Sequence, residues 1–309
     1  MADLFIVGQF YGVDSITAVA NGSQVLHMLT VIIVGLAMGT TVAIGRAVGG
    51  RRLEDAAHAI GNTITLFIIV AVVFTAGLLC FVRPIVLFIG TPEEAIAGSI
   101  RYLTICFIGI PFITAYNIIS SIFRGMGDSK SPMYFIAIAC VANIGLDYLF
   151  IGAMGLDAAG AALGTTIAQA ISVIIALSVI VKRGTGIKMV KSDFRPKAYT
   201  MKNILKVGVP VALQDGFIQI SFIIITIFAN QRGLNDAAAV GIVEKIIGIL
   251  FLVPSTMLST ISALASQNIG ADKHDRARLT LKYVLGMTGG YGLLAATIVQ
   301  FVSVPMVGL

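Results

Sequence analysis

The stretch Cys140-Val-Ala-Asn-Ile-Gly-Leu-Asp-Tyr-Leu-Phe-Ile151 lies inside an apolar segment that begins near Tyr134. A carboxylate such as that of Asp147 costs about 2.5–3.5 kcal/mol at the centre of a membrane-spanning helix. Asn143 precedes Asp147 by four residues, so the two polar side chains share one helix face. This arrangement is typical of a site that binds a proton or a small hard cation. The alternative is a hydrogen bond that joins two packed helices.

The composition is that of an all-α integral membrane protein. Of the 309 residues, 57% are hydrophobic and 12% are charged, and the mean hydropathy is +0.97. Such a chain is expected to form a bundle of membrane-spanning helices. The cysteines and histidines show no ligand spacing, which argues against a disulfide framework, a metal site and a metalloenzyme. No His/Glu/Asp or Ser/Lys cluster on facing helices is evident, so we expect neither an enzyme nor a cofactor. These residues are Cys80, Cys106, Cys140, His27, His58 and His274.

Eight apolar segments are long enough to cross a bilayer, which takes about 20 residues. They cover residues 21–45, 59–83, 99–123, 132–152, 158–182, 204–230, 238–267 and 280–303. The apolar stretch before them is too short to cross and is expected to be the end of a helix that starts earlier. The last residues follow directly on an apolar segment, so we expect the sequence to be a fragment of a longer protein. Glycine pairs at 35/39, 160/164 and 286/290 have the spacing that permits close helix contact.

Basic residues gather in every second loop. Seventeen of the 21 Lys and Arg residues fall in four loops, around 46–52, 124–130, 182–206 and 273–282. The positive-inside rule places these loops in the cytoplasm of a prokaryotic cell, in a multi-pass plasma membrane protein. A charge that recurs loop by loop is not the single basic patch of a nucleic-acid-binding protein. The net charge of +6 therefore predicts no nucleic-acid partner.

The chain also contains an internal repeat. At an offset of 221 residues, Gly12 aligns with Gly233, Ala18 with Ala239, Val19 with Val240, Gly49 with Gly270 and Ala56 with Ala277. The predicted topology repeats in the same register. We therefore expect an N-lobe at 1–182, a cytoplasmic linker at 183–203 and a partial C-lobe at 204–309, both lobes entering the membrane in the same direction. Parallel repeats of this kind are a known transporter plan, with the binding cavity between the halves.

Several motifs resemble the multidrug and toxic compound extrusion (MATE) transporters, in particular the DinF-like branch. The loop Phe123-Arg-Gly-Met-Gly-Asp-Ser-Lys-Ser-Pro132 is similar to a signature of that family. The glycine turns near 49 and 270, the segments 143–150 and 155–162, and Asp3-Leu-Phe-Ile-Val-Gly8 are similar as well. The resemblance implies twelve helices in two six-helix lobes. This sequence would then run from the end of helix one to helix nine.

The resemblance further implies a monomeric transporter in the lipid bilayer that exports lipophilic, cationic small molecules by alternating access, in exchange for H+ or Na+. Carried over residue by residue, the coupling site consists of Asp3, Asp147, Asn143, Asn117 and Thr165. Sodium would be held by Asp3, Asn143, Asp147 and Thr165, because hard cations prefer oxygen ligands. Tyr102, Gln214 and Asp215 are expected in the substrate cavity. Two carboxylates in one dry cavity cannot both stay charged without a proton or a cation between them.

The sequence departs from the NorM-like branch, which places an acid in helix seven where this chain has Ile218. Asp215 lies nearby and either attracts cationic substrate or is a polar residue satisfied near the helix start. The position equivalent to Asp3 in the second lobe is Ile224. These departures favour a coupling site in the N-lobe. The alternative function is a lipid-linked oligosaccharide flippase or a polysaccharide exporter of the same superfamily, but anionic lipid phosphates call for Arg or Lys in the cavity.

Overall fold

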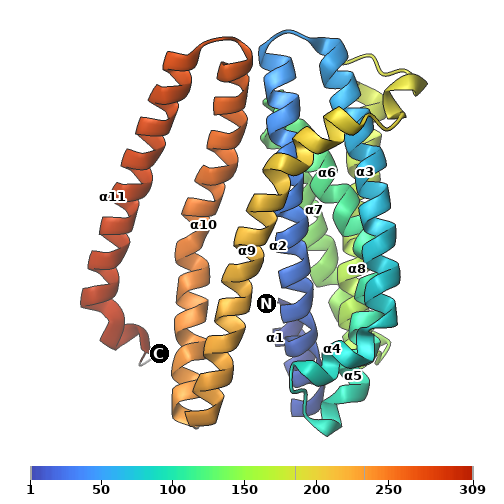
Figure 1. Cartoon of the computed structure of the whole chain (residues 1–309). Helices are drawn as coiled ribbons and strands as arrows, with labels where there is room; N and C mark the ends of the chain where they lie inside the picture. Colours follow the sequence, from blue (N-terminus) through green and yellow to red (C-terminus); the bar gives the residue numbers. More distant parts are fainter. Residues whose placement is uncertain (1, 185, 233, 308–309) are drawn as a thin grey trace.

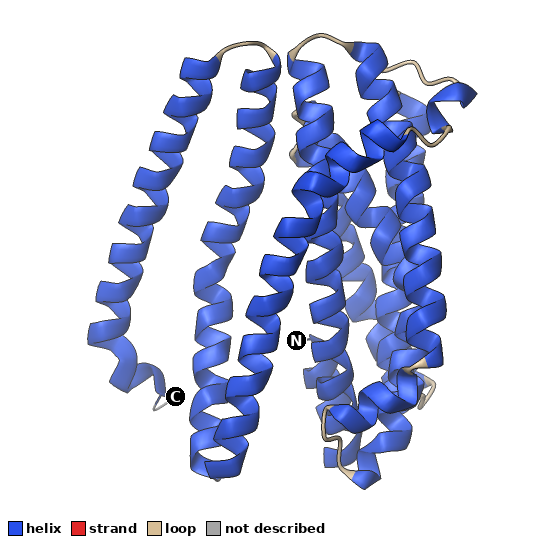
Figure 2. Cartoon of the chain, viewed as in Figure 1, coloured by secondary structure: helices blue, strands red, loops and turns tan. Residues whose placement is uncertain are grey.

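The computed structural model describes residues 2–184, 186–232 and 234–307, and the regular elements in those ranges are all helical (Figures 1 and 2). This confirms the all-α prediction. The helices are α1 (Ala2–Phe10), α2 (Val13–Gly49), α3 (Leu53–Cys80), α4 (Val82–Phe88), α5 (Glu93–Ile108), α6 (Ile110–Met126), α7 (Lys130–Asp147), α8 (Asp157–Arg183), α9 (Ala198–Arg232), α10 (Leu234–Gly270) and α11 (His274–Val307). A π-helical segment (Tyr148–Ala153) continues α7, and a 3₁₀ turn (Lys191–Phe194) precedes α9.

Seven of the described spans are long and apolar enough to cross a membrane, and α5 with α6 makes an eighth if the bent pair is one span. The two helices meet at Gly109 at an angle of 46°. Pro111 lies in the first turn of α6, where its missing N–H costs no helical hydrogen bond. The predicted crossing at 99–123 is therefore a broken one. Helix α2 is longer than its predicted 21–45, because it extends at both ends.

The signature loop around residue 127 has a local structural reason. Gly127 ends α6 with φ +94°, a left-handed conformation that glycine adopts without steric cost. Asp128 Oδ1 then accepts hydrogen bonds of 3.0 Å from the backbone N–H groups of Lys130 and Ser131. A carboxylate at this position satisfies the first free amides of α7 and complements its dipole. The motif is thus a sharp helix-to-helix turn.

Helix α2 is the central element of the first part of the chain. It contacts α1, α3, α5, α6 and α8, and on its other side it contacts α9 and α10. Its inward face joins a buried core that includes Ile33, Tyr102 and Phe107. In Figure 1, α9 crosses α2, α10 stands beside them, and α11 stands outermost and packs chiefly on α10.

The helix bounds show the same 221-residue offset as the sequence repeat. Helices α2 and α10 each have 37 residues and begin and end 221 positions apart. Helices α3 and α11 begin at Leu53 and His274, which have the same separation. Even the turns match, because Arg51 (φ 54°) and Asp272 (φ 56°) are both left-handed non-glycine residues. The division into an N-lobe and a C-lobe at the predicted residues stays a prediction.

The connection between α8 and α9 is shorter than predicted and is attached to α3. It covers residues 184–197 instead of 183–203, because the first turns of α9 begin at Ala198. Asn62 of α3 donates to the Asp193 carbonyl (3.2 Å) and accepts from the backbone N–H of Lys197 (2.6 Å). The Thr65 hydroxyl donates to the Phe194 carbonyl (2.8 Å). His58 Nδ1 lies 2.8 Å from Asp193 Oδ1. The linker is therefore a docked segment and not a free tether.

Candidate ion-coupling site

Asp147 lies at the point where α7 changes from α-helical to π-helical geometry, within the membrane span Lys130–Ala153. Its side chain is fully buried, at 0% exposure. Short π-helical segments are rare and occur frequently at functional sites. Gly164 of α8 faces the carboxylate so closely that a Cβ there would overlap Asp147 Oδ1. The glycine makes the space that the carboxylate occupies.

The structure brings four of the predicted coupling residues together from three helices. Asn143 donates its amide to Asp147 Oδ1 at 3.4 Å, one turn along the same helix. The Thr165 hydroxyl of α8 donates to Asp3 Oδ2 of α1 at 3.3 Å. The carboxyl groups of Asp3 and Asp147 are electrostatic neighbours. Asp3 and Asp147 are 144 positions apart in the chain, so only the fold makes them neighbours.

The acid pair needs a positive charge. Asp147 Oδ2 is buried, and no N–H or O–H of the described residues is assigned to it as a donor. Two ionised carboxylates that are close neighbours repel each other, and the burial of Asp147 increases the cost. One proton shared by the pair, or one cation between the oxygens, removes the repulsion. The arrangement can therefore hold and release a single positive charge.

Tyr102 of α5 is an electrostatic neighbour of the acid pair, and its place in the substrate cavity stays a prediction. Its side chain is 1% exposed and interacts electrostatically with Asp3, Asp147 and Cys106. Its ring packs on Gly22 of α2, where a Cβ would overlap the ring. Neither Gly22 nor Cys106 was predicted to be near the site. Both are small residues in apolar helices, and nothing in their sequence context distinguishes them from ordinary packing positions.

The other predicted residues do not join this cluster. Asn117 of α6 is buried, and its amide donates to the Ile113 carbonyl one turn earlier (2.8 Å). No hydrogen bond found between described residues links it to Asp3 or Asp147. Gln214 and Asp215 lie on α9, where Gln214 is exposed and Asp215 is half-buried. An apolar groove of about 270 Å3 runs between α2 and α9, but neither residue lines it.

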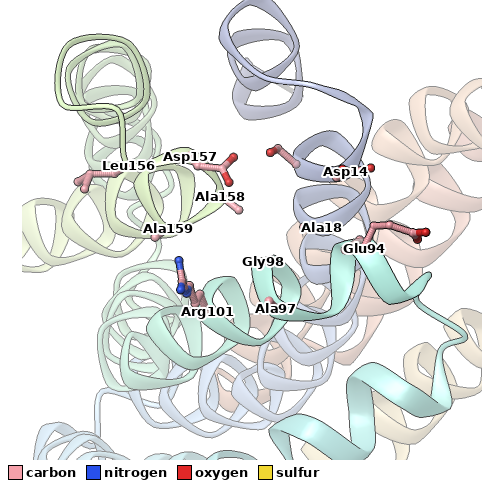
Figure 3. A pocket seen from close by; sticks show the side chains of 12 residues that line it. Asp14, Ala18, Glu94, Ala97, Gly98, Arg101, Leu156, Asp157, Ala158 and Ala159 are labelled. Atoms are coloured by element: carbon pink, nitrogen blue, oxygen red, sulfur yellow. The ribbon is translucent and has the colours of Figure 1, made fainter.

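A second pocket was not predicted from the sequence. It has a volume of about 230 Å3 and lies where the first turns of α2, α5 and α8 meet (Figure 3). Asp14, Glu94 and Asp157 line it together with Arg101. Each acid is in the first turn of its helix, where a negative charge is favourable next to the helix dipole. Helix-terminal electrostatics accounts for these acids, and we assign no ligand to the pocket. Within the described residues, no group of three or more His, Cys, Asp or Glu side chains could hold a metal ion.

Comparison with known proteins identifies the family. The sequence profile of the MatE family matches residues 1–149 and 210–309. The chain belongs to the MatE family. This membership confirms the predicted resemblance to MATE proteins, the multi-pass membrane location and the prediction that the chain is not an enzyme. The DinF-like branch stays a prediction.

Among the curated relatives of this MatE chain are two probable multidrug resistance proteins of Bacillus subtilis (strain 168). YoeA is 28% identical over 93% of the chain, and YpnP is 30% identical over 89%. The chain spans 65% and 61% of the length of these two relatives. A crystal structure of MATE in the bent conformation superposes with a TM-score of 0.89 at 24% identity, over 99% of this chain and 68% of that one. This likeness establishes the MATE fold.

Proposed function

We propose that the MatE chain is part of a secondary active transporter that exports lipophilic, cationic compounds in exchange for protons or sodium ions. The observation that carries the proposal is the acid pair Asp3–Asp147. Asn143 donates to the fully buried Asp147, Thr165 donates to the half-buried Asp3, and Tyr102 is an electrostatic neighbour of both acids. A carboxylate buried in a membrane span, such as that of Asp147, is costly, and ionisable groups within membrane bundles generally mark ion pathways. The names of the curated relatives support drug export as the activity.

Ion binding and substrate binding are coupled because the ion and the cationic substrate are both attracted to the negative charge of the acid pair. When the pair holds a proton or a cation, the N-lobe interior is closer to neutral and attracts cationic substrate less. When the pair releases it, the added negative charge favours substrate. By linkage, substrate must weaken ion binding by the same free energy. The ligand set suits either ion, because hydroxyl, amide and carboxylate oxygens are ligands for hard cations and also partners for a proton.

The hydrogen-bond lengths are compatible with an exchangeable occupant. The contacts from Asn143 to Asp147 (3.4 Å) and from Thr165 to Asp3 (3.3 Å) exceed the usual 2.7–3.2 Å for N–H···O and 2.5–3.0 Å for O–H···O bonds. Polar groups at these distances can turn toward an ion without first breaking strong bonds. Cationic cargo is favoured over the anionic cargo of a flippase because the buried acids lie at this site. The half-buried Arg124 lies in the last turn of α6, at the end with the basic loops.

The test is dye efflux from drug-sensitive bacteria that express the complete protein from its gene. Asp147→Asn keeps the size and polarity of the side chain but removes its charge, so we expect export of a fluorescent cationic dye to fall at least ~10-fold at equal membrane expression. Asp14→Asn is the matched control, because Asp14 is an exposed acid on α2. Collapse of the proton gradient in one assay and removal of sodium in another then separate the two ions. Unchanged efflux by Asp147→Asn would remove the acid pair from the mechanism.

Absence of dye export by the wild type would point to the flippase or polysaccharide-exporter alternative. Transport of a lipid-linked oligosaccharide would then be measured with the same variants.

A further inference from the structure

Two glycines bring the ends of α2 and α10 into backbone contact. Gly49 lies against the backbone of Gln267, and Gly270 lies against the backbone of Arg46. A Cβ on either glycine would overlap those backbone atoms. Arg46 and Gln267 are 221 positions apart, as are Gly49 and Gly270, so each half of the repeat makes the same contact to the other. Glycine at such a crossing allows helices to approach more closely than side chains would permit.

The same face of α2 continues this close packing onto α9. A Cβ on Gly39 would overlap the Ile204 carbonyl, and one on Gly35 would lie 2.7 Å from the Ala212 Cα. Gly45, between these positions and Gly49, packs on Ser266 of α10. All of these contacts fall between residues 35 and 50 of α2, the half that leads to the basic loops. In Figure 1, α9 and α2 cross toward that end and diverge toward the other.

A side-chain hydrogen bond reinforces the glycine contact. The Gln267 amide donates to the Gly125 carbonyl of α6 at 2.9 Å. Its nitrogen would lie 3.1 Å from a Cβ placed on Gly127, at the left-handed turn that ends α6. Helix α10 is therefore held at its end by α2 through backbone packing and by α6 through a polar bond. Both contacts lie on the side of the basic loops.

We propose that the Gly49–Gly270 crossing, together with the Gln267–Gly125 bond, is the cytoplasmic gate of this transporter, closed in this structure. The inference rests on the alternating access of the proposed function. The gate opens when α10 moves away from α2, and closure depends on both glycines because their neighbours are backbone atoms that cannot rotate aside. One added methyl group at either position therefore favours the open gate. Alanine is a better helix former than glycine, so helix propensity does not oppose the substitution.

The experiment measures the gate directly in the complete protein. Nitroxide labels are placed on Glu54→Cys and Asp275→Cys, two exposed and repeat-related positions next to the gate, after the three native cysteines have been replaced. Ordinary helix crossings have interaxial distances of about 8–10 Å. We expect Gly49→Ala and Gly270→Ala each to lengthen the mean label distance by at least about 3 Å in pulsed electron resonance. Unchanged distances in both variants would overturn the proposal.

Two further variants make the result specific. Gly248→Ala is the matched control on α10, because the described residues leave open space around that glycine, and it should leave the distance unchanged. Gln267→Ala removes the polar bond without adding bulk, so it should add a longer-distance population even if the glycine variants fail to insert. A distance that changes equally in Gly248→Ala would also contradict a local gate. The measurement uses no substrate and no ion gradient, so its outcome is independent of the Asp147→Asn efflux result.

Discussion

Gly164 determines whether the Asp147 carboxylate fits between α7 and α8, because an added Cβ would overlap Asp147 Oδ1. We expect Gly164→Ala to displace the carboxylate from Asp3 and to reduce dye export at least ~10-fold. Overpacking of this kind costs about 1–3 kcal/mol, so the protein should still insert. Gly145→Ala on α7 is the control, because a Cβ added there would meet no other part of the described structure within 4 Å. Efflux and thermal unfolding in detergent check both variants, and normal efflux by Gly164→Ala would contradict the tight fit.

At the residue scale, the sequence predicts contacts within one helix, but it does not predict contacts between residues of different helices. Asn143 and Asp147 could be paired because four residues make one helical turn. The meeting of Asp3 with Asp147 depended on the family resemblance, since no pattern within a helix relates residues 144 positions apart. The spacing of two glycines did not by itself predict whether they lie at a close helix contact. The 160/164 and 35/39 pairs lie at close contacts, whereas Gly286 and Gly290 face open space in the described structure, although all three pairs have the same spacing.

Helix α3 holds the α8–α9 connection through Asn62, whose side chain is fully buried and takes part in three hydrogen bonds. We expect Asn62→Ala to free residues 187–197, because it leaves buried backbone groups of the connection unpaired, at about 1–3 kcal/mol. The segment carries Lys188, Lys191, Arg195 and Lys197, so trypsin added on the cytoplasmic side should cleave it several-fold faster. Asn268→Ala is the control, because that amide bonds only within its own helix in the described structure. Equal cleavage rates would show that the contacts of Thr65 and His58 hold the connection without Asn62.

Predicted and observed elements agree best where hydropathy alone determines the helix. The crossing at 158–182 agrees within one residue at each end with α8 (Asp157–Arg183). The helices α3 and α9 each start six residues before the predicted crossings at 59–83 and 204–230, because their first turns are polar. The docking of the connection could not be predicted, since Asn62 and Thr65 bind backbone carbonyl and N–H groups that carry no sequence signature.

Across the whole molecule, the contacts of α2 with α9 and α10 lie toward the basic loops, and the opposite half of α2 leaves part of its surface uncovered. Gln24 is exposed and lies three turns before Gly35 on the same helix face, whereas Ser266 at the gate is 3% exposed. In a structure that is closed on the cytoplasmic side, a cysteine at position 24 should therefore react with a reagent added from outside the cell. The difference between the two ends of α2 is visible only in the folded structure. The 221-residue repeat in the sequence does not indicate which ends of α2 and α10 are in contact.

We expect a membrane-impermeant maleimide added to intact cells to label Gln24→Cys and to spare Ser266→Cys, in a background without the native cysteines. Arg52→Cys, exposed in a basic loop, is the topology control and should react only in inside-out vesicles. Combining Gly270→Ala with these variants should slow the labelling of Gln24→Cys and expose Ser266→Cys to reagent from the cytoplasmic side, because opening one end of an alternating-access protein closes the other. Labelling of Ser266→Cys in intact cells would show that this position is open to the outside, which contradicts a closed cytoplasmic gate there. Simultaneous labelling of both positions from opposite sides would mean that the two ends are not coupled.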